Sequence, residues 1–342
     1  MNNITQSMDP DKLRELQKAA GEGPVLIMTH EIPDPDALAS GEALAFLLKT
    51  LWNVNSRLEY SGFVGRAENV STLKYLAPNW IYTENFDHEA RYSSIALVDT
   101  QPGAGNNVLP DQIIPDMVFD HHQPLREPLD QVKYSDVRPD VGANASILAQ
   151  YLRLAGLVPD IVLSTAIFYG ILTDTRGLSR SASKLDKQMY FEYLSLIDHD
   201  LLIQVQTSGL RREYYQAFKE GLSAARVLGE VVISYMGNIH RPDFVSEMSD
   251  MLIRLEEVKI ALCMGYHDDR FYLSMRTGPL GYDAGHLVQE IILPPGRAGG
   301  HGRSAGGQVP LQGQDPDEIA QLIETRLLSI IGESEIAENL VK

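Results

Sequence analysis

Aspartate and histidine side chains recur in four short segments, and each segment follows an apolar run of the kind that forms a buried element. The segments are His30-Glu-Ile-Pro-Asp34-Pro-Asp36, Val98-Asp99-Thr100, Phe119-Asp120-His121-His122 and Leu172-Thr173-Asp174. In an open α/β sheet, ligands bind beyond the carboxyl ends of the strands, where these side chains would meet. Carboxylate oxygens and imidazole nitrogens are ligands for Mn²⁺, Mg²⁺ and Zn²⁺. The pattern therefore predicts a metal-dependent hydrolase.

The first segment could serve two metal ions. Asp34 and Asp36 are two residues apart, so in an extended loop their side chains face different ways, and the intervening prolines stiffen that loop. Two metals ~3.5–4 Å apart can activate a water molecule and hold the phosphate that it attacks. Such a pair needs a bridging carboxylate. Asp99 is the natural candidate because it ends a separate strand, and His121 and Asp174 would complete the second metal.

Each aspartate taken alone could instead be a helix cap or a turn residue. Four such clusters at consecutive element ends favour a shared site over four separate caps. The remaining histidines lack this context, and we expect them to be ordinary surface or core residues: His88, His199, His240, His267 and His286.

The elements that must position these residues alternate along the first half of the chain. Strands are predicted at 25–29, 95–98 and 117–119, and helices at 9–20, 37–51, 143–154 and 184–196. Asp36 is predicted to be the N-cap of the second of these helices. Residues 166–172 could be strand or helix. Such alternation predicts an α/β domain with a mostly parallel sheet and helices on both faces.

The second half of the chain has a different order of predicted helices and strands and carries no further cluster of potential metal ligands. A helical stretch at 201–226 is followed by predicted strands at 231–235, 258–264 and 271–275, with helices at 244–257 and 316–331. We therefore predict a metal-binding catalytic domain over 1–195, a linker over 196–212 and a smaller α/β substrate-binding domain over 213–342.

Composition limits the partners and the compartment. The chain has 342 residues and a formal charge of −17, which counts against binding long nucleic acid but not against a short anionic substrate held at metal ions. One cysteine and no apolar run of ~20 residues predict a reducing compartment and no membrane association. The N-terminus has no apolar leader segment, so cytoplasmic residence is expected.

A glycine-dense segment, 296–307, suggests phosphate binding. Glycines let backbone N–H groups approach an anion closely, and His301 and Arg303 add side-chain donors. A flexible surface loop is the alternative interpretation.

The ligand segments resemble the motifs of the DHH phosphoesterase superfamily, which is named for the triplet found here as Asp120-His121-His122. The resemblance implies two manganese ions per chain, one held by His30, Asp34 and Asp99 and the other by Asp36, Asp99, His121 and Asp174. It implies that His122 is not a ligand but a donor or acid beside the scissile phosphate. Asp120 would orient a histidine.

The glycine-dense segment resembles the Gly-Gly-Gly-His motif of the DHHA1 domain, with Ala298 in place of a glycine and Ser304 in place of an alanine. Leu273-Ser-Met-Arg276 resembles a Ser-x-Arg strand of that domain. The resemblance implies that the substrate is bound by Arg276, Gly299, Gly300, His301, Gly302 and Arg303. The stretch after Asp99 lacks an arginine that many relatives have, which leaves the near-side phosphate contacts open.

The compact two-domain form resembles the nanoRNase/pAp phosphatase group, which acts on short oligoribonucleotides and on 3′-phosphoadenosine 5′-phosphate (pAp). The expected partners are therefore short oligoribonucleotides or small nucleotides, with a homodimer left open. Alternative interpretations are a cyclic or linear dinucleotide phosphodiesterase, an exopolyphosphatase-like hydrolase, a RecJ-like exonuclease, a manganese pyrophosphatase and a non-catalytic nucleotide sensor.

Overall fold

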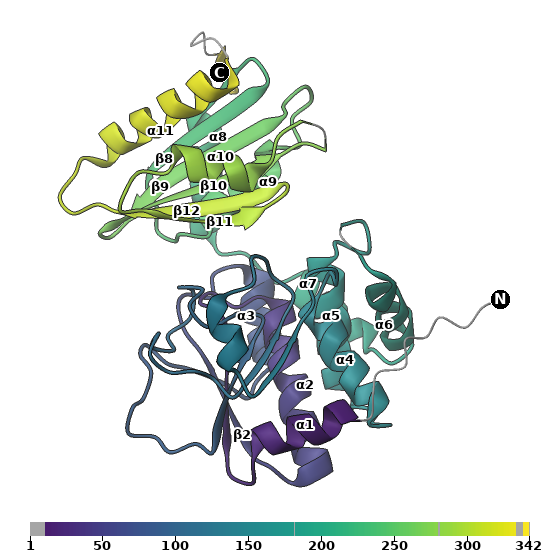
Figure 1. Cartoon of the computed structure of the whole chain (residues 1–342). Coiled ribbons are helices and arrows are strands. Elements are labelled where there is room, and N and C mark those ends of the chain that lie inside the picture. Colours follow the sequence, from purple (N-terminus) through teal and green to yellow (C-terminus); the bar gives the residue numbers. More distant parts are fainter. Residues whose placement is uncertain (1–10, 181, 280, 333–337, 342) are drawn as a thin grey trace. The chain divides into compact units, whose positions relative to one another are not determined.

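The chain folds into two compact units, Met1–Ser208 and Gly209–Lys342. The structure is a computed structural model that describes residues 11–341 except 181, 280 and 333–337. Figure 1 colours the first unit from purple to teal and the second from green to yellow. Among the described residues, no helix is both long enough and apolar enough to cross a membrane.

The first unit is built on a six-stranded sheet in which all neighbouring strands are parallel, in the order β3-β2-β1-β4-β5-β6. The strands are β1 (Val25–Met28), β2 (Ser56–Tyr60), β3 (Trp80–Tyr82), β4 (Ser94–Val98), β5 (Met117–Asp120) and β6 (Tyr134–Val137). The predicted mostly parallel sheet is confirmed. The strand order reverses between β1 and β4, and ligands of open α/β sheets bind at such a switch point.

Seven α-helices and one 3₁₀ helix accompany this sheet within the described residues. They are α1 (Asp11–Ala20), α2 (Pro35–Trp52), α3 (Ala67–Tyr75), η1 (Glu127–Gln131), α4 (Asn144–Leu154), α5 (Ile161–Asp174), α6 (Lys184–Leu194) and α7 (His199–Gln206). The ambiguous run before Asp174 is therefore helical, and Asp174 ends a helix rather than following a strand. The predicted N-cap is also wrong: α2 begins at Pro35, two residues before the predicted start, and Asp34 is its cap, accepting from the N–H groups of Asp36 and Ala37.

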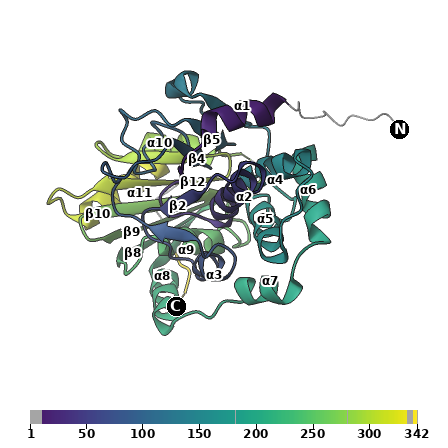
Figure 2. The ribbon, with the colours of Figure 1, turned by 90° about the horizontal axis from the view of Figure 1, so that it is seen from below.

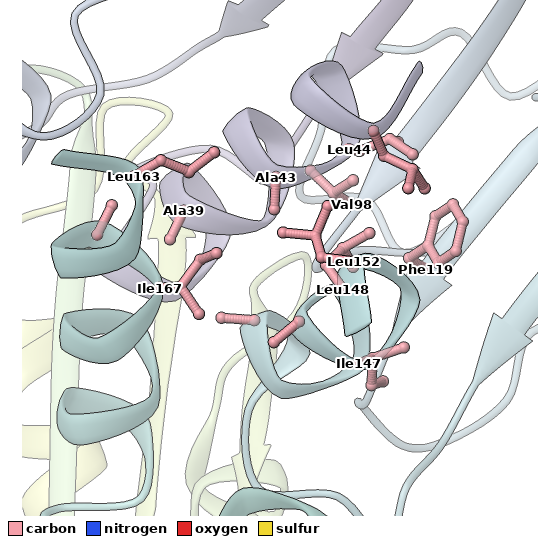
Figure 3. Close-up of a cluster of buried hydrophobic side chains, with 14 of the residues drawn as sticks. Ala39, Ala43, Leu44, Val98, Phe119, Ile147, Leu148, Leu152, Leu163 and Ile167 are labelled. Carbon is pink, nitrogen blue, oxygen red and sulfur yellow. The ribbon is translucent and has the colours of Figure 1, made fainter. Parts of the chain in front are cut away.

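The main core lies on one face of the sheet, beneath the helices. Figure 3 shows side chains of α2, α4 and α5 converging over strands β4 and β5. The side chains of Ala39 and Ala43 on α2 are small, so Leu148 of α4 and Ile167 of α5 can pack closely against this helix. Burial of each large aliphatic side chain contributes about 1.5–3 kcal/mol, so this packing helps to hold the start of α2, the start of α4 and the end of α5 together.

The opposite face of the sheet carries loops instead of α-helices. Its apolar residues come from alternate strand positions, such as Leu26 and Met28 of β1, and pack against loop residues such as Leu109 and Leu129. Right-handed crossovers place the β1–β2–β3 connections on one face and the β4–β5–β6 connections on the other. Here the latter connections contain only loops and η1. The expectation of helices on both faces is therefore wrong for the described residues.

The second unit has a seven-stranded mixed sheet in the order β11-β12-β10-β9-β8-β7-β13, in which only the β8–β9 pair is parallel. The strands are β7 (Ala225–Leu228), β8 (Val231–Asn238), β9 (Ile260–His267), β10 (Arg270–Thr277), β11 (Arg297–His301), β12 (Ser304–Pro310) and β13 (Glu338–Asn339). The helices are α8 (Arg212–Ala224), α9 (Phe244–Leu252), α10 (Ala284–Ile291) and α11 (Pro316–Ile331).

Helices cover both faces of this second sheet. Figure 2 shows α8 and α9 together below the strands, while α10 lies above them. The predicted helical stretch 201–226 is interrupted between α7 and α8 and ends in β7. The glycine-dense segment forms the hairpin of β11 and β12, so the alternative interpretation of it as a flexible loop is wrong.

Candidate metal centre

The loop that follows β1 is held by hydrogen bonds to the segments that follow β2 and β4. The N–H of Glu31 donates to the carbonyl of Asn106, 2.5 Å away, and the N–H of Ile32 donates to the carbonyl of Ser61, 3.1 Å away. Ile32 has a φ of 61°, an unusual value for a β-branched residue. A strained loop held from both sides gives His30 and Asp34, which flank this residue, a defined position.

The first ligand group consists of His30, Asp34 and Asp99, whose candidate ligand atoms lie within 4.8 Å of one another. His30 places Nε2 3.4 Å from Asp99 Oδ2, while its Nδ1 lies 2.9 Å from the Glu31 carbonyl. A backbone carbonyl at the second ring nitrogen is the usual way in which proteins orient a metal-binding histidine.

The second group consists of Asp36, His121 and Asp174. His121 Nε2 lies 3.3 Å from Asp174 Oδ2 and 3.9 Å from Asp36 Oδ2. Its Nδ1 lies 3.1 Å from the Val141 carbonyl, so this histidine is oriented in the same way as His30. The group draws on the start of α2, the segment after β5 and the end of α5.

Asp36 is held at the N-terminus of α4. Its carboxylate accepts from the N–H of Asn144 at 2.6 Å and from the N–H of Ala145 at 2.7 Å, where the helix dipole favours a negative charge. Gly170 of α5 makes this close packing feasible, because a Cβ there would lie 3.0 Å from the Asp36 Cα. The three helices thus meet at one ligand.

Asp99 joins the two groups. It is buried, and its Oδ1 lies 3.3 Å from His121 Nε2 while its Oδ2 faces His30. Its φ of 59° turns the chain sharply after β4, and its N–H donates to the Phe119 carbonyl at 2.8 Å. One carboxylate with an oxygen toward each group has the geometry expected of a bridging ligand.

The residues present fit a divalent cation. Asp99 Oδ1 and His121 Nε2 are buried without a hydrogen-bond partner among the described residues, and a buried unpaired polar group calls for an ion or a water. Burial raises the pKa of Asp174 to about 6. Burial, and then the charges of Asp99 and Asp174, raise the pKa of Asp36 well above its usual range. A cation would relieve this crowding of carboxylates.

The two histidines flank Asp99 as positive partners. Burial lowers the pKa of His30, but the contact with Asp99 outweighs it and raises that pKa to about 10. Burial also lowers the pKa of His121, but the contact with Asp99 outweighs it, so that pKa is raised well above its usual range. For Asp99 itself, burial is outweighed by His121 and His30, so its pKa is lowered. Asp99 therefore stays an anion.

His122 lies at the edge of the ligand cluster, where Asp99, His121 and His122 form a third group whose candidate ligand atoms lie within 4.8 Å of one another. Its Nδ1 lies 2.8 Å from Asp120 Oδ1 and 3.6 Å from Asp99 Oδ1, and its side chain is 46% exposed. Burial lowers the pKa of His122, but the hydrogen bond to Asp120 outweighs it and raises that pKa. Because Nδ1 is engaged by Asp120, Nε2 is the nitrogen left to meet a substrate.

In the second unit, Arg276 lies on β10 in an ion pair that the sequence did not predict. Its Nε donates to Asp250 Oδ1 at 2.7 Å and its Nη1 to Ser274 Oγ at 3.0 Å, and the side chain is 13% exposed. Asp250 of α9 therefore restrains the guanidinium. No short motif in the sequence marks that aspartate.

The predicted glycine-rich anion site is a hairpin whose turn is tied to α10. The N–H of Gly302 donates to Asp283 Oδ2 at 3.0 Å, and the Gly302 carbonyl accepts from the N–H of Ala284 at 2.6 Å. The Gly302 N–H is thus already paired. Gly299, Gly300 and Arg303 are exposed, and the side chain of His301 lies outside the described residues.

The sequence did not predict one buried residue near the ligand groups, Gln101. Its side chain donates hydrogen bonds to Asp120 and to the carbonyl of His122. It lies two residues after Asp99 in a stretch without a motif. A polar side chain directly after a buried strand end was the only available signal.

Comparison with known proteins identifies the second unit. Residues 228–328 match the DHHA1 domain. The chain is 32% identical over 334 residues to the uncharacterized protein MJ1633 of Methanocaldococcus jannaschii, a match that covers 95% of this chain and 67% of that protein. It is 28% identical over 187 residues to the uncharacterized protein MJ0988 of the same organism, covering 53% of this chain and 52% of that protein.

The fold of the whole chain also has a solved counterpart. An exopolyphosphatase-related protein from Bacteroides fragilis superimposes with a TM-score of 0.72 at 14% identity, covering 95% of this chain and 98% of that protein. At this identity the likeness speaks for the fold. The family model adds one domain, the DHHA1 domain at residues 228–328. The chain therefore belongs to one family with MJ1633, and its second unit contains a DHHA1 domain at residues 228–328.

Proposed function

We propose that this chain is a manganese-dependent phosphoesterase that hydrolyses short oligoribonucleotides and small nucleotides, pAp among them. The observation that carries the proposal is the position of Asp99 between two ligand groups. His30, Asp34 and Asp99 would hold one divalent ion, and Asp36, Asp99, His121 and Asp174 a second. When bound, such a pair supplies an activated water and neutralises charge on the phosphate.

The chain's own residues supply the rest of the chemistry. Asp99 stays anionic between His30 and His121, so it can bind on both sides without first losing a proton. His122 holds a proton at Nδ1 toward Asp120 and presents Nε2 outward. From there a protonated ring can donate to an oxygen of the ester as the leaving group departs. The exposed position of His122 suits contact with a substrate.

Charge favours a short substrate. With a formal charge of −17, the surface repels a long polyanion, whereas a short one can be held at the metal ions alone. We expect oligomers of about two to five nucleotides to be cut faster than strands above about twenty, since long-strand binding depends on phosphate neutralisation by basic side chains.

The direct test is a panel of substrates and metals. Protein stripped with EDTA and refilled separately with Mn²⁺, Mg²⁺, Zn²⁺ or Co²⁺ would be assayed on pAp, pApA, a short RNA, c-di-AMP and tripolyphosphate. Mn²⁺-loaded protein should hydrolyse pAp or pApA fastest and contain two ions per chain by metal analysis. Full activity after EDTA treatment, or active protein without a divalent ion, would overturn the proposal.

Apolar surface beside the ligand loop favours a nucleotide over a chain of bare phosphates. Ile32, between His30 and Asp34, is 43% exposed, and Phe63 in the loop after β2 is 47% exposed. The two loops are in contact, because a Cβ at Gly62 would lie 3.3 Å from Ile32 Cγ1. Polyphosphate has no group that would gain from this surface, whereas a nucleobase does.

Replacing Phe63 with alanine should therefore separate the two substrate classes. Stacking of a base on an aromatic ring is worth about 1–3 kcal/mol, so kcat/KM for pApA should fall about 5- to 150-fold. Hydrolysis of tripolyphosphate should not change. Phe191→Ala, at another exposed phenylalanine, on α6, is the matched control. Equal loss on both substrates would show that Phe63 only supports the loop.

Arg276→Ala should lower turnover of pAp and pApA strongly and that of bis-p-nitrophenyl phosphate much less. The planar guanidinium can pair two phosphate oxygens, and binding energy from a remote group can be used to position the reacting phosphate. Arg270→Ala, at the exposed start of the same strand, is the control. If Asp250→Ala reproduced the loss on all three substrates, the ion pair would be purely structural.

A further inference from the structure

The side chain of Gln101 connects the two strand ends that carry Asp99 and Asp120. It is only 3% exposed. Its Nε2 donates to Asp120 Oδ2 at 2.7 Å and to the His122 carbonyl at 3.0 Å, and its Oε1 accepts from the N–H of Arg126 at 3.0 Å. The orientation of the amide is unambiguous, because a carboxylate can only accept and a backbone N–H can only donate.

Both carboxylate oxygens of Asp120 have a fixed partner. The residue is fully buried, its Oδ2 faces Gln101, and its Oδ1 faces His122 Nδ1 at 2.8 Å. The same amide also binds the main chain at two points of the segment that begins with His122, namely the carbonyl of His122 and the N–H of Arg126. Both the ring and the backbone of His122 therefore depend on one glutamine.

We propose that Gln101 is a positioning residue: it fixes Asp120 and the loop after His122, so that this histidine keeps its proton on Nδ1 and presents Nε2 to the substrate. The functional half of this inference rests on the proposed phosphoesterase activity. The structural half concerns only the state of the His122 ring and can be tested without any substrate.

Gln101→Glu is the most informative single substitution. The new carboxylate can still accept from the N–H of Arg126, but it sets an acceptor against Asp120 Oδ2 where a donor stood. We expect kcat to fall roughly 10- to 100-fold, the usual effect of losing a partner that orients a functional side chain near a metal site, with KM and metal content nearly unchanged. Gln101→Met, which removes all three bonds at similar volume, should show the same division between kcat and KM.

A reversal of donor and acceptor should restore the link. In the double variant Gln101→Glu with Asp120→Asn, the new amide at position 120 can donate to the new carboxylate at position 101. Its carbonyl oxygen still accepts from His122 Nδ1. We expect the double variant to be faster than either single variant. Losses that simply multiply would show that the two residues act independently and would overturn the proposal.

The state of the ring is read directly by NMR of ¹⁵N-histidine-labelled, metal-free protein at a pH where His122 is neutral. The wild type should show a proton on Nδ1 and a bare Nε2, and both single variants at Gln101 should show the other tautomer. Variants that keep the wild-type tautomer and kcat would refute the proposal even if they unfold at a lower temperature. A wild type that hydrolyses no phosphate ester would refute the proposed function instead, while the tautomer measurement would still decide the role of Gln101.

Discussion

Asp99→Asn should remove nearly all hydrolytic activity and reduce the number of bound metal ions. Asp99 is the one carboxylate among the described ligand residues that faces both groups, and an amide oxygen carries no charge to offset two cations. Metal stabilisation of phosphate chemistry is worth several kcal/mol, and each ~1.4 kcal/mol is tenfold in rate, so a loss of roughly 10³-fold or more is expected. Steady-state rates on pApA and metal analysis of the purified variant check both parts.

Thermal unfolding supplies an independent measure of the same change. Metal that binds only the folded state raises stability by about 2.7 kcal/mol at a hundred times its dissociation constant. The wild type should therefore gain in Tm with added Mn²⁺, and Asp99→Asn should gain much less. Asp111→Asn, at an exposed aspartate between β4 and β5, should behave as wild type. A variant at position 99 that still binds two ions and turns over normally would exclude a bridging role.

The location of the ligands could be predicted because three of the four segments follow short, largely apolar strands. Val25–Met28, Ser94–Val98 and Met117–Asp120 are neighbouring strands, so their carboxyl ends meet at one edge of the sheet. The fourth segment could not be resolved in this way. A buried helix and a buried strand are equally apolar over seven residues, and only the structure shows that Asp174 ends α5.

Local patterns also fail where the partner is distant in the sequence. Asp36 looked like a cap for its own helix, but Asp34 fills that role and Asp36 instead holds the N-terminus of α4, more than a hundred residues later. Arg276 likewise has a partner that no sequence pattern marks, because Asp250 of α9 forms an ion pair with it. Periodicity reports which residues share an element and says nothing about which polar atoms meet across the fold.

The second sheet illustrates the same limit for backbone groups. The glycines of 299–307 predicted an anion site, and the structure shows that this segment pairs as β11 and β12 and that Asp283 accepts from the N–H of Gly302. Gly302 takes a φ of 58° at the turn, and Gly285 of α10 permits the close approach of the hairpin, because a Cβ there would lie 2.5 Å from the Gly300 carbonyl oxygen. A glycine-rich motif therefore predicts close backbone approach, but not what approaches.

His122→Ala should lower kcat by roughly 10²- to 10⁴-fold while the protein keeps its metal ions. The ring is half exposed and its Nδ1 is paired with Asp120, so its removal takes away a donor to the substrate. The groups His30–Asp34–Asp99 and Asp36–His121–Asp174 stay complete, and only the third group, of Asp99, His121 and His122, loses a member. His121→Ala is the informative contrast, because His121 places Nε2 among Asp36, Asp99 and Asp174. That variant should lose metal and activity together. His199→Ala, at an exposed histidine on α7, should change neither.

If metal content fell as far in His122→Ala as in His121→Ala, His122 would have to be counted among the ligands, since its Nδ1 lies 3.6 Å from Asp99 Oδ1. If His122→Ala retains metal and loses only turnover, the two adjacent histidines have different roles. His121 completes the metal centre, and His122 acts on the substrate that the centre holds.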